Sequence, residues 1–231
     1  MDKNIFQDME KYDFAKLVPN IFQVLEDVKG KVQNNNQDFQ DWLKFAKQDL
    51  DASVILYEKE DFRNSIYLLQ QSVEKACKYY GLSYGLISQK DLHKDVSHVS
   101  PKIFKIFINQ SSVDLVKNLG GKEIKVDEFE KALKNKKEMI NISEKFIEIC
   151  FNMSFQLETN FNKIKLLDKK IINFSILNVN LYSLSMITYA HINCRYPDET
   201  IVYNKETPIV KKYNDIVKVL KKVIGELEKN E

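Results

Sequence analysis

Two residues near position 190 have side chains suited to phosphate chemistry. His191 and Arg195 are four positions apart, so on a helix they would lie on the same face. Arginine can grip a phosphate oxygen, and histidine can exchange a proton near neutral pH with a neighbouring ribose 2′-hydroxyl. Two structural roles are the simpler interpretation: cations stabilise the end of a helix, and Arg195 can pair with Asp198. The pair is therefore a candidate phosphate-binding site, catalytic site or helix cap.

The chain has only one other arginine, Arg63, which is followed by Asn64. These two residues come at the start of a predicted helix, where backbone N–H groups face outward and can bind an anion. An ordinary surface pair in a turn is the simpler interpretation. We treat Arg63 and Asn64 as candidate nucleotide- or RNA-binding residues, together with His191 and Arg195.

Other chemistries find less support in the sequence. His93 and His98 flank Asp95 in a loop, but nothing fixes the third and fourth ligands that a metal site needs. Glu74 and Lys78 have the spacing of a structural ion pair on an exposed helix face. P-loop, GxSxG, HExxH and GxGxxG patterns are absent, which argues against the commonest hydrolases and nucleotide-hydrolysing enzymes. We expect neither a metal nor a cofactor.

The elements that must position these residues are helices. Six glycines and four prolines in 231 residues are too few for the turns of a sandwich or barrel. Apolar residues recur at helical spacing instead, and we expect the helix that starts at position 64 to end at Gly81. The predicted helices span 41–59, 64–80, a segment from Pro101, 126–151, 171–194 and 208–229. The sequence predicts an all-α protein.

Composition limits the class of protein further. Hydrophobic residues make up 44% of the chain and the net charge is only +2, so a core can form but the basic excess of a nucleic-acid coat is missing. Cysteines 77, 150 and 194 lie in apolar stretches, which is typical of buried, reduced thiols. The N-terminus shows no signal peptide. Segment 171–194 has no charge, but its asparagines favour a central bundle helix over a membrane span. We expect a cytoplasmic protein.

Three separated pieces of sequence share a further pattern. They are WLKFA with DL and Ala52 (42–52), FRNSIY leading into QQSVEKACK (62–78), and YAH leading to RYPD (189–198) before a closing helix. In this order they resemble the HEPN family of prokaryotic helical domains, in particular the subgroup encoded beside minimal nucleotidyltransferases. The loop with His93 and His98 is similar to a family loop and, more weakly, to the abortive-infection V branch.

The resemblance implies an up-and-down helical bundle, usually a homodimer with a cleft between protomers. It would occupy 38–229, with 111–170 as an inserted long helix or helical pair and 1–37 as an N-terminal helical arm and linker. Many family members are metal-independent ribonucleases with an Arg, four to six residues and a His. In this chain the positions where that His would stand are Leu68 to Gln70 after Arg63 and Thr200 to Val202 after Arg195. The ribonuclease motif is therefore missing.

The expected function follows from the resemblance and from this missing motif. We expect a nucleotide- or RNA-binding protein of a toxin–antitoxin or phage-defence system, which lacks ribonuclease activity and has a possible nucleotidyltransferase partner. One alternative is a metal-independent ribonuclease that uses His191 and Arg195 in rearranged order. Another is a helical adaptor that docks a nucleotidyltransferase through residues 123–151.

Overall fold

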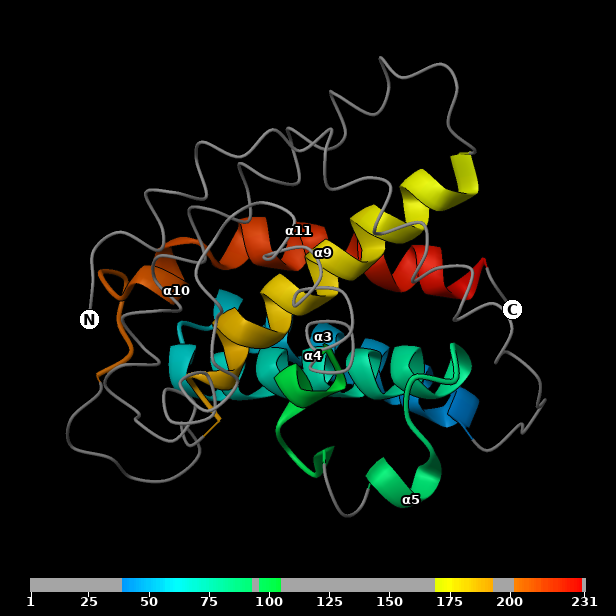
Figure 1. The fold of residues 1–231 in the computed structure, drawn as a ribbon. Helices are drawn as coiled ribbons and strands as arrows, with labels where there is room; N and C mark the ends of the chain where they lie inside the picture. Colours follow the sequence, from blue (N-terminus) through cyan, green and yellow to red (C-terminus); the bar gives the residue numbers. More distant parts are fainter. Residues whose placement is uncertain (1–38, 93–95, 105–168, 193–201, 230–231) are drawn as a thin grey trace, which may run out of the picture.

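The computed structural model describes residues 39–92, 96–104, 169–192 and 202–229 (Figure 1). Every regular element in these ranges is a helix, which confirms the all-α prediction. The predicted arm at 1–37, the helix at 126–151 and nearly all of the 111–170 insertion lie outside the described residues. The elements are α3 (Gln40–Glu58), α4 (Phe62–Ser83), α5 (Gln89–Asp91), the 3-10 helix η4 (Ser100–Phe104), α9 (Lys169–Tyr189), α10 (Pro208–Lys211) and α11 (Tyr213–Glu228).

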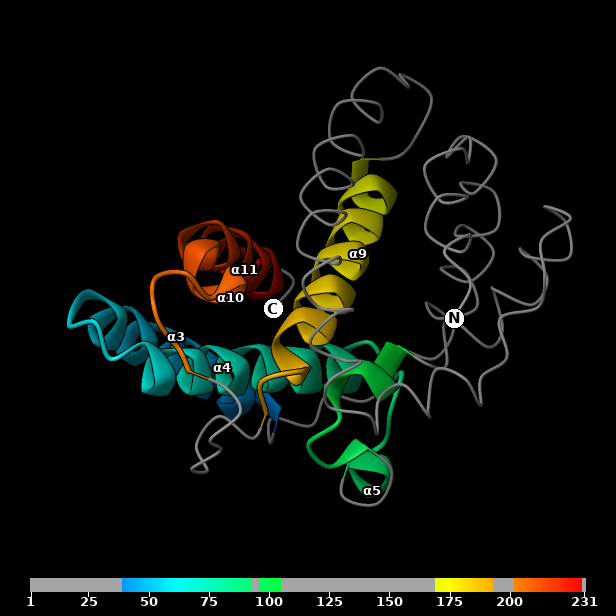
Figure 2. The ribbon, with the colours of Figure 1, turned by 90° about the vertical axis from the view of Figure 1, so that its left-hand side faces the viewer.

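Helices α3 and α4 form an antiparallel hairpin, and α9 and α11 lie across it as a second layer (Figure 2). The turn of the hairpin is short because Glu60 adopts a φ of 60° and reverses the chain. The N–H of Asp61 then donates to the Leu56 carbonyl at 2.9 Å and the N–H of Glu60 donates to Tyr57 at 3.0 Å, which caps α3. Asp61 also caps α4, since its carboxylate accepts from the Asn64 backbone.

Small polar side chains fix the register of the hairpin. The Ser53 hydroxyl donates to the Ser65 carbonyl at 2.8 Å, and the Ser65 hydroxyl donates to the Ser53 carbonyl at 2.9 Å. Two turns further along α4, Ser72 donates to the Ala46 carbonyl at 2.7 Å. All three serines are buried. Because each hydroxyl has a partner, the two helices approach closely without an unsatisfied polar group between them.

Helix α9 contains most of the charge-free segment 171–194, and its described side chains are contacted on nearly all sides, as expected of a central bundle helix. The four consecutive residues Leu184, Ser185, Met186 and Ile187, which point in different directions around the helix, are each at most 2% exposed. The hydroxyls of Ser185 and Thr188 bond to carbonyls of the preceding turn, so polar side chains are tolerated in a packed helix. Within the described ranges, no helix is both long enough and apolar enough to span a membrane.

The C-terminal segment confirms most of the predicted helix at 208–229. Pro208 occupies the first turn of α10, where its missing N–H costs nothing. The predicted apolar stripe from Ile209 to Leu227 is buried against the hairpin and α9. The chain nevertheless forms two helices, because α10 ends at Lys211 and α11 begins at Tyr213.

The prediction that the helix ends at Gly81 is wrong. Helix α4 continues to Ser83, and the residue that reverses the chain is Gly85, with a φ of 64°. The N–H of Leu86 donates to the Gly81 carbonyl at 2.8 Å and the N–H of Gly85 donates to Leu82 at 3.1 Å. Gly81 is required for a different reason: a Cβ there would lie 2.9 Å from Ile87.

Two glycine substitutions test this assignment. Gly81→Ala is expected to destabilise the protein by about 1 kcal/mol, because overpacking outweighs the gain in helix propensity. Gly225→Ala, in α11, is expected to stabilise it by about 0.5 to 1 kcal/mol, since a Cβ there meets nothing within 4 Å. Urea denaturation of both variants measures the difference, and equal effects would contradict the packing role of Gly81.

The connection after α4 differs from the helix that was predicted to start near Pro101. It contains the short helix α5, and Ser88 and Asp91 form a capping box at its N-terminus. The segment that begins at Ser100 is a 3-10 helix as far as Phe104, and the remainder of the predicted helix lies outside the described residues. Ile103 and Phe104 are buried, and η4 packs against α4 and α9. This packing holds the residues before η4 against the middle of α4.

Candidate functional site

The structure places Arg63 and Asn64 in the first turn of α4. Arg63 is half-buried and Asn64 is exposed. The Asn64 side chain donates from Nδ2 to Asp61 Oδ2 at 2.8 Å, so it reinforces the cap of the helix. The Asp61 carboxylate already satisfies the N–H of Asn64 at this helix start. Arg63 therefore carries the positive charge of this pair, while Asn64 holds the turn.

His191 lies beyond the helix on which it was expected. Helix α9 ends at Tyr189, and the N–H of His191 donates to the Thr188 carbonyl in a turn. The imidazole is 5% exposed and its Nδ1 is 2.9 Å from the Tyr203 hydroxyl, with the two rings edge to face. A shared helix face with Arg195 would require His191 to lie on a helix, and His191 does not. Arg195 itself lies outside the described residues.

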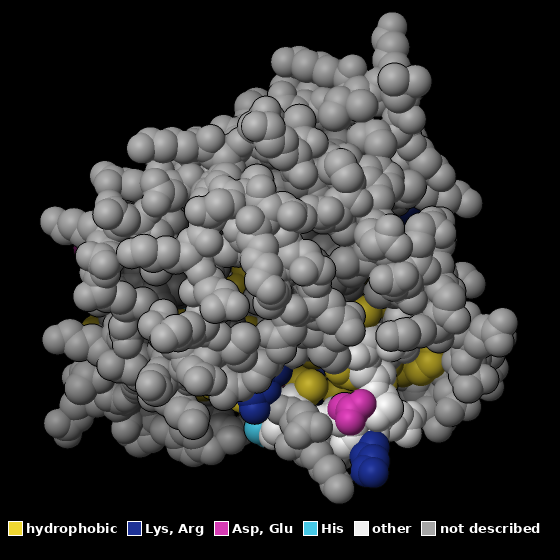
Figure 3. Space-filling view, in the orientation of Figure 1, with side chains coloured by type: hydrophobic (Ala, Val, Ile, Leu, Met, Phe, Trp, Pro, Cys, Tyr) yellow, Lys and Arg dark blue, Asp and Glu magenta, His cyan; other side chains and the backbone are white. Residues whose placement is uncertain are grey.

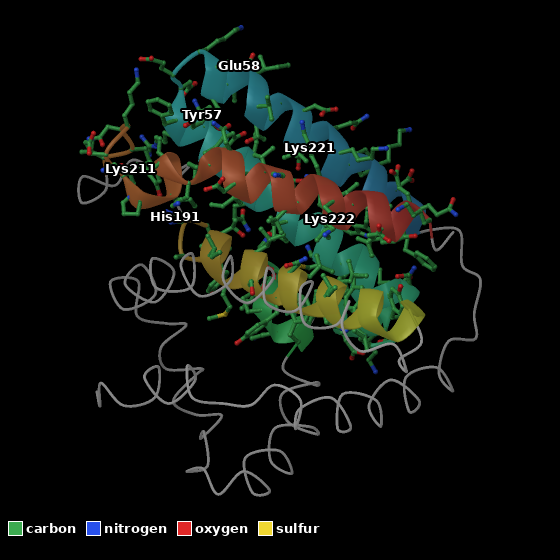
Figure 4. The ribbon with its side chains drawn as sticks, turned by 90° about the horizontal axis from the view of Figure 1, so that it is seen from above. Tyr57, Glu58, His191, Lys211, Lys221 and Lys222 are labelled. Carbon is green, nitrogen blue, oxygen red and sulfur yellow. The ribbon has the colours of Figure 1, made fainter. Side chains whose placement is uncertain are left out.

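The end of α9 and the start of α4 nevertheless lie at the same end of the bundle, at the left in Figure 1. The segment that contains Tyr203 connects them, because Lys205 forms an ion pair with Glu60 in the hairpin turn. The Tyr57 hydroxyl also donates to the Val210 carbonyl at 3.1 Å, and Figure 4 shows His191, Tyr57 and Lys211 at this end. Three of the four predicted site residues are therefore carried by elements that meet at one end.

The sequence did not reveal a second cluster of polar side chains halfway along α4. Glu74 and Lys78 form the expected ion pair at 2.7 Å, but their side chains are only 4% and 8% exposed. The prediction of an exposed face is wrong, since α3 covers one side of α4 and α9 and η4 cover others. Gln70 is buried beside them and donates to Glu74 Oε2 at 3.1 Å, while Gln71 donates to Gln70 at 2.6 Å.

Two residues from other elements complete this cluster. His98, just before η4, places its Nδ1 3.1 Å from Glu74 Oε1, and its side chain is 66% exposed. From α3, Trp42 lies under the Lys78 ammonium, 4.9 Å from the ring centroid, which favours the cation. The buried carboxylate of Glu74 thus joins three elements. The sequence held one signal that Glu74 is buried. Positions 66, 70 and 74 lie along one face of the helix, and the first of them, Ile66, is apolar.

Neighbouring groups stay in their neutral forms. Burial raises the pKa of the Cys77 thiol, and the charge of Glu74 adds to this effect, so Cys77 is the buried, reduced thiol that was predicted. Burial also raises the pKa of Tyr80 well above its usual value, and its hydroxyl bonds to Asn178 at 2.6 Å. Cys150, Cys194 and His93 lie outside the described residues. Among the described ones, no three His, Cys, Asp or Glu residues are grouped as metal ligands.

Comparison with known proteins assigns the family. The HEPN domain model matches residues 39–153, about half of the chain, including α3, α4 and the cluster around Glu74. The comparisons with curated proteins and with solved structures gave no match. HEPN domains are generally related to nucleotides or RNA. The helical hairpin, the all-α bundle and the family match agree, and the chain belongs to the HEPN-domain family.

Proposed function

We propose that this protein binds a nucleotide or RNA and does not cleave RNA itself. The family match to residues 39–153 carries the first half of the proposal. The sequence supports the second half, because no His stands at the ribonuclease spacing after Arg63 or Arg195. The burial of His191 and its bond to Tyr203 also favour a role in shaping the site over proton transfer with a substrate.

The binding surface that we propose lies at the end of the bundle where α4 begins and α9 ends. Arg63 and Arg195 would contact phosphate, since a guanidinium matches its geometry. Asn64 and His191 would keep the turn at Asp61 and the segment at Tyr203 in place. The N-terminal end of the α4 dipole adds a favourable potential for an anion.

The biological setting that we propose is a prokaryotic toxin–antitoxin or phage-defence system. In it the protein would act as a homodimer, with a nucleotidyltransferase as a possible partner. The family resemblance supports this setting through the order of its sequence pieces and the RYPD motif that precedes the closing helix. Size-exclusion chromatography with light scattering would measure the oligomeric state, and co-purification would test for the partner.

Arg63→Ala is expected to weaken binding of a short single-stranded RNA about tenfold, because one charge-assisted contact is lost. Fluorescence anisotropy at fixed salt measures the affinity, and Lys218→Ala on the exposed face of α11 is the matched control. In the same samples the wild-type protein is expected to leave the RNA intact without added metal. Cleavage by the wild type that is lost in His191→Ala would overturn the proposal and establish a ribonuclease. Unchanged affinity of Arg63→Ala would exclude Arg63 from the site.

A further inference from the structure

His98 is an exposed side chain held by a buried one. Its Nδ1 lies 3.1 Å from Glu74 Oε1, and the exposed fractions of the two side chains are 66% and 4%. The other ring nitrogen, Nε2, forms no hydrogen bond within the described part of the chain. In Figure 3 a histidine side chain reaches the surface beside a basic side chain. A surface imidazole anchored at one nitrogen thus presents the other to solvent.

The anchor determines what His98 can do. When a carboxylate binds Nδ1–H, it fixes the orientation of the ring and the nitrogen that carries the proton. Glu74 is itself held in place, by Lys78 at 2.7 Å and by Gln70 at 3.1 Å. The position of the Nε2 atom is therefore set by helix α4 and not by the loop alone. Such preparation is of little use to a side chain that only meets water.

We propose that His98 is a ligand-contacting residue and that Glu74 is its positioning residue. Nε2 would hydrogen-bond to the nucleotide or RNA, so the inference rests on the proposed function. The Lys78 ammonium, over Trp42 and next to Glu74, offsets the charge of the buried carboxylate. This contact lies three turns along α4 from Arg63, so RNA could reach both points.

A pair of substitutions separates contact from packing. In His98→Asn the shorter amide keeps a donor close to the Nδ1 position, but it has no counterpart of Nε2. We expect RNA affinity to fall roughly tenfold while the melting temperature stays within about 2 °C. Gln89→Ala, at an exposed position in the neighbouring α5, is the matched control and is expected to bind like the wild type.

A second measurement uses the full chain with AMP as the probe. In a long-range ¹H–¹⁵N spectrum of the histidine rings, AMP is expected to shift the Nε2 resonance that is missing in His98→Asn. If His98→Asn binds RNA as the wild type does and AMP leaves that resonance in place, the inference is wrong. If Arg63→Ala still weakens RNA binding in that case, the proposed function stands without it. Absence of any binding by the wild type would overturn both.

Discussion

Glu74→Ala is expected to cost about 3 to 5 kcal/mol of the free energy of unfolding, because it leaves the Lys78 ammonium buried without its partner. The Lys78 side chain is 8% exposed, so water cannot replace the lost carboxylate. His98 and Gln70 lose their shared acceptor at the same time. Urea denaturation followed by circular dichroism measures the loss, which corresponds to a fall in melting temperature of roughly 10 °C.

The control for this prediction removes both charges. The double variant Glu74→Met, Lys78→Met is expected to be clearly more stable than Glu74→Ala, since no unpaired charge is left in the bundle. Lys75→Ala provides a second comparison: its ion pair with Asp49 is more exposed, at 22% and 20%, and its loss is expected to cost about 1 kcal/mol or less. A small effect of Glu74→Ala would show that the cluster is hydrated in solution.

Tyr213→Ala is expected to cost about 3 to 5 kcal/mol, because a large buried aromatic side chain is lost. Tyr213 is 1% exposed and stacks on Tyr57 with ring centroids 3.9 Å apart. Its hydroxyl lies 2.6 Å from Ser53 Oγ, where α3, α4 and α11 meet. Thermal denaturation of the purified variant measures the effect.

Tyr213→Phe separates the ring from the hydroxyl. It keeps the stacking on Tyr57 and leaves the Ser53 hydroxyl bonded to the Ser65 carbonyl, so we expect a loss of only about 1 kcal/mol. Equal losses in the two variants would place the stabilisation in the hydroxyl. The test also bears on the domain, since Tyr213 lies outside residues 39–153 but inside the core of the bundle.

The helices themselves could be predicted well from the sequence. The stripe of α3 at Leu43, Ala46 and Leu50 and the stripe of α11 are buried as their spacing indicates, since one apolar face per helix is a strong signal. Asp61 at the N-cap of α4 and Pro208 in the first turn of α10 are residue types that favour these positions. These are local features, and local sequence determines them.

The missed features depend on contacts between segments far apart in the chain. Glu74 looked exposed because its spacing to Lys78 is that of a surface pair, and only η4 and α3 reveal that it is covered. Gly81 was taken as a helix end because glycine is common there, whereas its role is to admit Ile87. The end of α9 at Tyr189 has no breaker nearby, because the first proline beyond it is Pro197. The predicted site residues stay a prediction, because a site is formed by contacts between segments that spacing in the sequence does not give.

The bond between Ser53 and Tyr213 has a consequence for synthesis. It joins residues 160 positions apart, and at ribosomal rates of 5 to 20 residues per second that distance takes roughly 10 to 30 s to translate. The α3–α4 hairpin needs only local contacts and can form early. Until α9 and α11 emerge, however, the apolar surface that they cover stays open on the nascent chain. This interval is when aggregation and chaperone binding compete with folding.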